Sequence, residues 1–79
     1  MPKVIIYSTP TCPWCKLAKE FFEKHHIAFE DKNVAANHSA VDEMVKKSGQ
    51  LGVPVIDIDG QIVIGFDQKK ISQLLKIEP

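Results

Sequence analysis

Hydrophobic positions near the start of the chain form one unbroken run and then change to a helical spacing. Residues 3–8 are β-branched and apolar without alternation, which predicts a strand buried on both faces of a sheet. After a break at residues 9–11, apolar side chains recur at helical spacing, at Trp14, Leu17, Ala18, Phe21 and Phe22. We therefore expect an amphipathic helix that begins at Cys12 and runs to about His26.

The middle of the chain predicts an edge strand and a second helix. Residues 27–34 alternate apolar with charged side chains, and the polar residues suit the edge of a sheet. Ser39 and Asp42 resemble a capping box, and Gly49 is placed to end a helix. The buried stripe of this helix is expected to be Val41, Met44 and Val45.

The last third of the chain predicts a hairpin followed by a helix. Residues 54–58 and 61–64 flank Asp59-Gly60, a strong signal for a two-residue turn. Asp67 is placed to cap a last helix with an apolar face of Ile71, Leu74 and Leu75. The order βαβαββα predicts an α/β fold, and its first two strands should be parallel with a right-handed crossover.

Size and charge limit the classes of function. The 79 residues predict a single domain over residues 1–79, and ten basic side chains balance ten acidic ones. This neutrality argues against nucleic acid or an anionic membrane as the main partner. The apolar run near the N-terminus is too short for a signal peptide or a membrane span, so we expect a cytoplasmic protein with no membrane partner.

The two cysteines, Cys12 and Cys15, are the strongest chemical signal. A secreted domain of this size would usually carry two to four disulfides, so a lone close pair indicates reactive rather than structural cysteines. Unpaired N–H groups and the helix dipole favour a thiolate at a helix start. We expect Cys12 to be the nucleophile and Cys15, three residues on, to resolve the mixed disulfide. Trp14 is favoured as an aromatic face beside the sulfur, although it suits a core position too.

Two alternatives remain at this stage. Cys-X-X-Cys is also half of a zinc site, but His25 would lie about 15 Å farther along a continuous helix, which disfavours a metal site. Pro54 either simply opens a strand or follows a cis Val53-Pro54 bond packed against the sulfurs, which would leave the Val53 backbone free to pair with a substrate.

Three motifs resemble those of the glutaredoxins. They are residues 7–15 (Tyr-Ser-Thr-Pro-Thr-Cys-Pro-Trp-Cys), residues 49–54 (Gly-Gln-Leu-Gly-Val-Pro) and residues 65–67 (Gly-Phe-Asp). The resemblance implies the thioredoxin-like fold, a four-stranded mixed sheet flanked by three helices, with a cis proline at Pro54 beside the cysteines. It also implies a glutathione or peptide site bordered by Trp14, the backbone of Val53, and the Gly65-Phe66-Asp67 turn.

Several positions depart from the glutathione-using members. Thr9 stands where these typically carry a lysine, and Leu51 where they carry arginine or lysine. Other departures are Gly52 for threonine, Ile64 for the first glycine of a Gly-Gly turn, and Trp14 for tyrosine. The Gly65-Phe66 turn is more similar to that of the small redoxins that receive electrons from thioredoxin reductase and feed ribonucleotide reductase.

The main hypothesis is a monomeric thiol-disulfide oxidoreductase, a dithiol electron carrier that cycles Cys12 and Cys15 between dithiol and disulfide. It would reduce protein disulfides or mixed disulfides, with glutathione or a thioredoxin-reductase-type flavoprotein as reductant. No tightly bound cofactor is expected, and glutathione would be a co-substrate. The alternative is a glutathione-dependent iron–sulfur carrier that uses Cys12 from two copies, disfavoured by the intact Cys15. A structural adaptor is the least favoured, because it would not need both cysteines.

Overall fold

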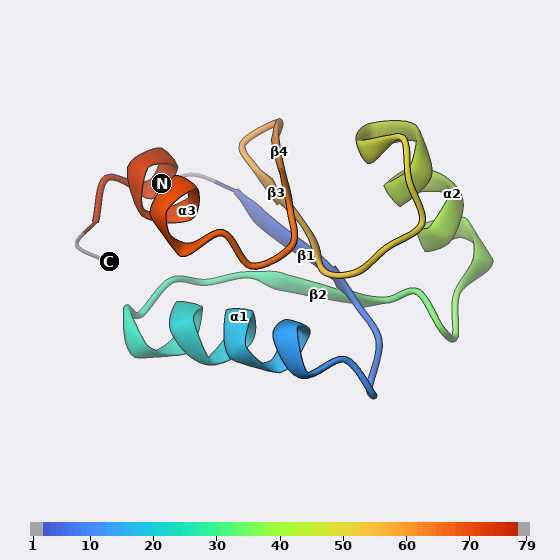
Figure 1. Cartoon of the computed structure of the whole chain (residues 1–79), viewed down its shortest axis with the longest axis horizontal. Coiled ribbons are helices and arrows are strands. Elements are labelled where there is room, and N and C mark those ends of the chain that lie inside the picture. Colours follow the sequence, from blue (N-terminus) through green and yellow to red (C-terminus); the bar gives the residue numbers. More distant parts are fainter. Residues whose placement is uncertain (1–2, 78–79) are drawn as a thin grey trace.

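Strands and helices follow one another in the predicted order in the computed structural model, which describes residues 3–77 (Figure 1). The elements are β1 (Val4–Ser8), α1 (Pro13–Lys24), β2 (Glu30–Asn33), α2 (His38–Ser48), β3 (Val55–Ile58), β4 (Gln61–Ile64) and α3 (Gln68–Leu75). The prediction of the order βαβαββα is therefore confirmed.

The four described strands form one mixed sheet in the order β2-β1-β3-β4. β1 pairs with β2 in parallel, with Ile5 opposite Glu30, and with β3 antiparallel, with Ile6 opposite Ile56. β3 and β4 form the predicted antiparallel hairpin. All five residues of β1 are buried, whereas β2 lies at the sheet edge, so both predictions about strand position are confirmed.

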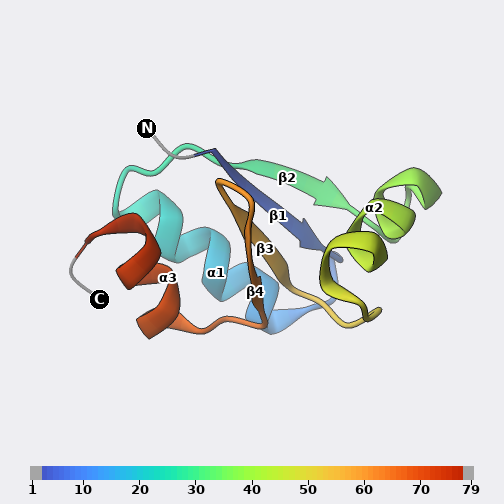
Figure 2. The same cartoon turned by 90° about the horizontal axis from the view of Figure 1, so that it is seen from above.

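The two faces of the sheet are covered by different helices. α1 and α3 pack on the face that carries Val4 and Ile6, and α2 packs on the face that carries Ile5 and Tyr7. Figure 2 shows α2 on the other side of the strands from α1 and α3. The first face has the larger core and includes Phe21 and Phe22, with the Phe21 ring 5.7 Å from that of Phe66. The larger hydrophobic core therefore lies on the side of the sheet that holds the cysteine helix.

Some predicted boundaries were wrong by a few residues. α1 ends at Lys24 with His25 as its C-cap, two residues before the expected end at His26. β2 covers only Glu30–Asn33 of the expected residues 27–34, and β3 begins one residue after Pro54. The bounds of β2 and β3 follow their pairing with β1, because an isolated strand extension leaves its backbone groups unpaired.

Three side-chain assignments also need correction. The cap of α2 is Asn37, whose Oδ1 accepts from Ala40 N at 3.2 Å, so Ser39 lies inside the first turn and does not cap the helix. In the same helix Ala40 and Met44 are buried, while Val41 and Val45 are only half-buried. In α1, Leu17 is 44% exposed and so lies outside the core, and the 59% exposure of Trp14 excludes the core position, which was the less favoured of its two. The reason is that Cys15, Ala18 and Phe22 take the centre of the buried stripe, and this rotates Trp14 and Leu17 outwards.

Candidate functional site

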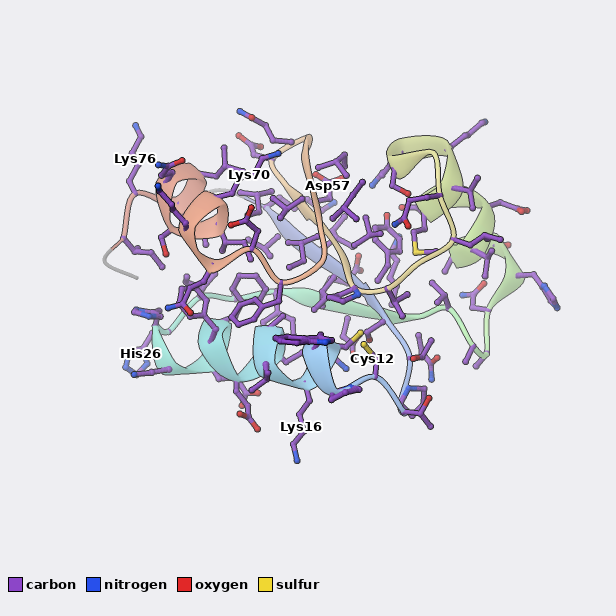
Figure 3. All side chains as sticks on the ribbon, in the orientation of Figure 1. Cys12, Lys16, His26, Asp57, Lys70 and Lys76 are labelled. Atoms are coloured by element: carbon purple, nitrogen blue, oxygen red, sulfur yellow. The ribbon has the colours of Figure 1, made fainter. Side chains whose placement is uncertain are left out.

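Cys12 lies directly before α1, at the end of the loop that leaves the central strand β1. It is the N-cap of α1, with an extended backbone (φ −91°, ψ 110°), and Pro13 takes the first helical position. Its Sγ accepts a hydrogen bond from Cys15 N at 3.2 Å. Figure 3 shows Cys12 at this end of α1. The Cys12 sulfur therefore accepts from a backbone N–H that has no partner within the helix, and it lies at the positive end of the helix dipole. Both features favour a negative charge on the sulfur.

Cys15 differs from Cys12 in exposure. Its side chain is 1% exposed, whereas Cys12 is half-buried, and both are present as thiols. Burial, followed by the hydrogen bond with Cys12, raises the pKa of the Cys15 thiol to about 12. A substrate can therefore reach Cys12 first, while Cys15 lies behind it as an enclosed, protonated thiol.

The Val53-Pro54 segment packs against the cysteine end of α1. The peptide bond between these residues is cis, so the question left open by the sequence is decided in favour of the cis form. The Cys12 thiol points toward Val53 O at 3.9 Å. On the far side of the proline, Gly65 N donates to Pro54 O at 2.8 Å. This contact brings the turn after β4 to the same place as the cysteines.

A groove of about 270 Å³ opens at this meeting point, lined by Trp14, Val53, Pro54, Gly65 and Phe66. Every lining residue is one for which the sequence predicted substrate contact. Gly65 has φ +79°, a backbone conformation that favours glycine and lets the turn approach Pro54 closely. At this volume the groove is small by the standard of ligand pockets.

Asp67 is the one predicted substrate residue outside this lining. It is the N-cap of α3, and its Oδ1 accepts from Lys70 N at 3.1 Å. The capping role predicted for it is confirmed, and substrate contact by Asp67 stays a prediction.

The loop before Val53 carries no cation at its tip. Leu51 is 71% exposed, and beside it the Gln50 side chain brackets Gly52, accepting from Gly52 N and donating to Gly52 O, both at 3.0 Å. A Cβ at position 52 would lie 2.7 Å from Gln50 Oε1. Glycine at position 52, where glutathione-using members carry threonine, therefore leaves the space that the Gln50 side chain needs to bond to the loop backbone.

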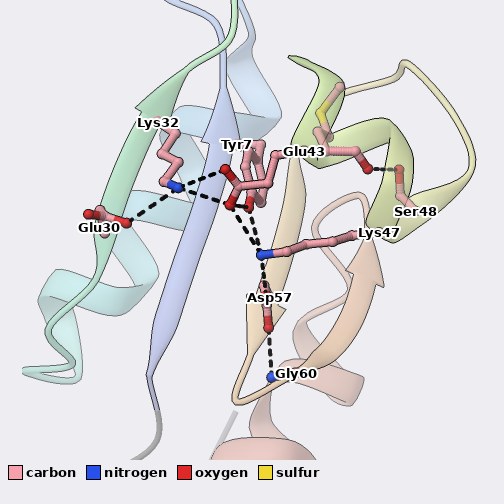
Figure 4. A network of polar contacts seen from close by, with 9 residues as sticks. Tyr7, Glu30, Lys32, Glu43, Lys47, Ser48, Asp57 and Gly60 are labelled. Atoms are coloured by element: carbon pink, nitrogen blue, oxygen red, sulfur yellow. Dashed lines mark hydrogen bonds and ion pairs between the residues drawn. The ribbon is translucent and has the colours of Figure 1, made fainter. Parts of the chain in front are cut away.

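Sequence reasoning missed a polar network beneath α2, centred on Lys47 (Figure 4). Lys47 Nζ lies 2.8 Å from Tyr7 Oη, 2.7 Å from Asp57 Oδ2 and 3.4 Å from Glu43 Oε1. Tyr7 donates to Glu43 at 2.6 Å, and Lys32 Nζ approaches the same carboxylate at 2.9 Å. The signal available in the sequence was Asp57, a carboxylate within an otherwise apolar strand.

The network shifts the protonation of its members. The hydrogen bonds from Tyr7 and then Lys32 lower the pKa of Glu43 to about 2, against an ordinary value of 4.5. Burial opposes the charge on Lys47, but the bonds to Asp57 and Tyr7 prevail and raise its pKa. Burial, and then the bond to Glu43, raise the pKa of Tyr7. The network therefore holds Glu43 and Lys47 as ions, with Tyr7 neutral between them.

Two further observations concern metals and membranes. Within residues 3–77, no group of three or more histidine, cysteine, aspartate or glutamate side chains is arranged to hold a metal ion. No helix in the same range is both long and apolar enough to cross a membrane.

Comparison with known proteins gives a consistent set of relatives. The sequence model of the Glutaredoxin family matches residues 4–63. An uncharacterized glutaredoxin-like 8.6 kDa protein in the rubredoxin operon of Clostridium pasteurianum is 51% identical over 71 residues, which cover 90% of this chain and 95% of that protein. Glutaredoxin 3 of Escherichia coli is 37% identical over 67 residues, covering 85% of this chain and 81% of that protein.

Two further proteins extend the comparison, one by sequence and one by its solved structure. The glutaredoxin-like protein NrdH of Lactococcus lactis is 30% identical over 71 residues, covering 90% of this chain and 97% of that protein. The crystal structure of the glutaredoxin from Archaeoglobus fulgidus superposes with a TM-score of 0.87 at 26% identity, covering 96% of this chain and 88% of that one. The predicted thioredoxin-like fold, with its four-stranded mixed sheet and three helices, is confirmed.

Proposed function

The chain belongs to the glutaredoxin family of thiol-disulfide oxidoreductases, and we propose that it is a dithiol electron carrier that reduces protein disulfides or mixed disulfides through Cys12 and Cys15. The observation that carries this proposal is the arrangement of the two sulfurs. Cys12 is half-buried at the helix N-cap with a backbone N–H directed at it, and Cys15 is 1% exposed one turn behind. This arrangement separates an attacking thiol from a resolving one.

The proposed cycle balances as two exchanges. The Cys12 thiolate attacks one sulfur of the substrate disulfide, which forms a mixed disulfide and releases the other sulfur as a thiolate that takes up a proton. Cys15 then loses its proton and attacks Cys12 Sγ, which forms the Cys12–Cys15 disulfide and releases the second substrate thiol. Two electrons and two protons, from two molecules of an external thiol that become a disulfide or from a flavoprotein, return the pair to the dithiol.

The groove supplies the proposed substrate site. Trp14 offers an exposed aromatic face, and Val53, Pro54, Gly65 and Phe66 complete the lining. The Val53 carbonyl lies 3.9 Å from the attacking sulfur, so a substrate backbone aligned with Val53 would bring its own sulfur to Cys12. We also propose that Asp67 contacts the substrate, because it directly follows the lining residue Phe66 in the chain.

The choice of reductant depends on local charge. Glutathione carries two carboxylates, and family members that use it place cations at the positions of Thr9 and Leu51, which here are uncharged. We therefore propose that glutathione is a poor reductant and that a thioredoxin-reductase-type flavoprotein supplies the electrons. We place the cycle in the cytoplasm, where free thiols persist.

Substitution of each cysteine tests the proposal. Cys12→Ser should abolish reduction of a protein disulfide, whereas Cys15→Ser should retain activity only on substrates that an external thiol can resolve. The measurement is NADPH consumption with thioredoxin reductase, and in parallel with glutathione and glutathione reductase. Alkylation at neutral pH provides a check without turnover, and faster labelling of Cys15 than of Cys12 would contradict the assignment.

A further inference from the structure

A short chain of polar contacts lies on the face of the sheet that α1 covers. Lys19 Nζ lies 2.6 Å from Asp31 Oδ2, and the other oxygen of Asp31 accepts from Ser8 Oγ at 2.6 Å. Ser8 is 1% exposed and is the last residue of β1, Asp31 belongs to the edge strand β2, and Lys19 belongs to α1. The contacts therefore fix a lysine ammonium group against the sheet.

This lysine is one helical turn from the resolving cysteine. Residues four apart on a helix have Cβ atoms about 5–6 Å from each other, which places Lys19 beside Cys15 on α1. Lys16 has no such position, because it is exposed and points away from the sheet in Figure 3. The Lys19 side chain is only 27% exposed, and its charge is therefore less screened by water.

The resolving step needs a charge where burial opposes one. Cys15 must lose its proton before it attacks Cys12 Sγ, yet its burial favours the neutral thiol. The groups that act on it are Cys12 on the same helix, the Thr9 backbone before α1, and the Lys19 ammonium group. Cys12 opposes the Cys15 thiolate, and this opposition ends in the mixed disulfide, where Cys12 Sγ carries neither a proton nor a charge. Lys19 and the Thr9 backbone then remain to favour the Cys15 thiolate.

We propose that Lys19 is a positioning residue for the resolving step, held by Asp31 and Ser8 so that its ammonium group stabilises the Cys15 thiolate in the mixed disulfide. The inference rests on the proposed dithiol cycle. It concerns the step in which Cys15 gives its proton to solvent, bonds to Cys12 Sγ and expels the substrate sulfur as a thiolate. Lys19 transfers no proton and forms no bond in this step.

The first test needs no turnover. Because the chain has two cysteines, Cys12→Ser leaves Cys15 as the only thiol, and its titration can be followed by thiolate absorbance. In this background Lys19→Gln should move the midpoint upwards by roughly half a unit to one unit, while Lys19→Arg should leave it close to that of the parent. Lys16→Gln is the matched control and should move it less than Lys19→Gln. Equal midpoints for the parent and Lys19→Gln would overturn the inference.

The second test separates the two chemical steps. With a chromogenic aromatic disulfide, attack by Cys12 releases one coloured thiolate in a bimolecular phase, and attack by Cys15 releases the second in a unimolecular phase. Lys19→Gln should slow the second phase about threefold, since a rise in thiol pKa lowers the thiolate fraction but raises its nucleophilicity. The first phase should change little, and Lys19→Arg should restore the second.

The outcomes distinguish the inference from the proposed function. If the unmodified protein shows no second phase, the dithiol cycle itself is wrong. If it shows a second phase that Lys19→Gln and Lys16→Gln leave equally fast, only the role of Lys19 is wrong. Thermal unfolding of each variant shows whether the fold is kept, and Lys19→Arg, which preserves the pair with Asp31, separates charge from side-chain shape.

Discussion

Replacing Lys47 with methionine should destabilise the protein far more than an ordinary surface substitution would. Methionine keeps the apolar stem but removes a charge that contacts oxygen atoms of Tyr7, Asp57 and Glu43. Asp57 is affected most, because its side chain is 10% exposed and would retain the Gly60 N–H, at 2.7 Å, as a hydrogen-bond partner but lose the cation beside it. The loss is thus mainly the cost of an uncompensated carboxylate.

The size of the effect follows from burial. Breaking a buried ion pair from one side costs about 3–5 kcal/mol. The Lys47 side chain is 29% exposed, so water reaches the pair and screens it, and we expect roughly 2–3 kcal/mol. For a domain of this size that corresponds to a fall of about 10–20 °C in Tm.

Urea and thermal unfolding, followed by circular dichroism, would measure this loss. Lys46→Met is the matched control, since Lys46 is an exposed neighbour on α2, and it should change the free energy of unfolding by less than about 0.5 kcal/mol. Adding Asp57→Asn to Lys47→Met should recover part of the loss, because it removes the unpaired charge. A Lys47→Met variant as stable as Lys46→Met would refute the reasoning.

Three further predictions concern other parts of the structure. Because Glu43 has a folded pKa of about 2 against 4.5, its contribution is complete above pH 4.5 and is lost as the pH falls toward 2. Glu43 is 37% exposed, so we expect only roughly 1 kcal/mol, and Glu43→Gln should flatten this part of the stability profile in acid titrations. Asp67→Ala should lower the free energy of unfolding by about 1 kcal/mol through loss of the α3 cap, measured by urea titration. Thr9→Lys combined with Leu51→Arg should raise the affinity for glutathione by up to about a hundredfold and therefore raise glutathione-linked turnover. Reductase-linked turnover should stay nearly unchanged. The glutathione prediction would be contradicted if the unmodified protein used glutathione efficiently and the double substitution gave no gain in turnover.

The sequence predicts the features that depend on local pattern. The buried run of β1, the Asp59-Gly60 hairpin and the cap at Asp67 were all predicted from neighbouring residues, and all are found. The cysteine end of α1 was predicted because the chemistry of a thiolate and the geometry of a helix start coincide. Features encoded within a few residues are therefore accessible without a structure.

Other features were not predicted, because short sequence patterns do not specify them. Asn37 displaces Ser39 as the cap of α2 because the chain leaving β2 reaches the helix two residues earlier than the capping-box pattern indicates. Leu17 lies outside the core because Cys15 occupies the buried stripe of α1. The sequence pattern was interpreted without cysteine as a core residue, although a free cysteine packs as a small hydrophobic side chain. The Lys47 network joins residues up to 40 positions apart, which no local spacing specifies.

The caps of the helices differ in one respect with a consequence for redox behaviour. In residues 3–77, α2 and α3 are capped by the oxygens of Asn37 and Asp67, whereas α1 is capped by the sulfur of Cys12. In the proposed dithiol cycle, oxidation would therefore weaken the N-cap of α1, because an anionic sulfur is a stronger acceptor for Cys15 N than a sulfur bonded to another sulfur. By thermodynamic linkage, the free energy by which α1 stabilises a Cys12 thiolate equals the free energy by which that thiolate stabilises α1. In the proposed cycle, the redox state of Cys12 and the stability of the first turn of α1 would thus be coupled.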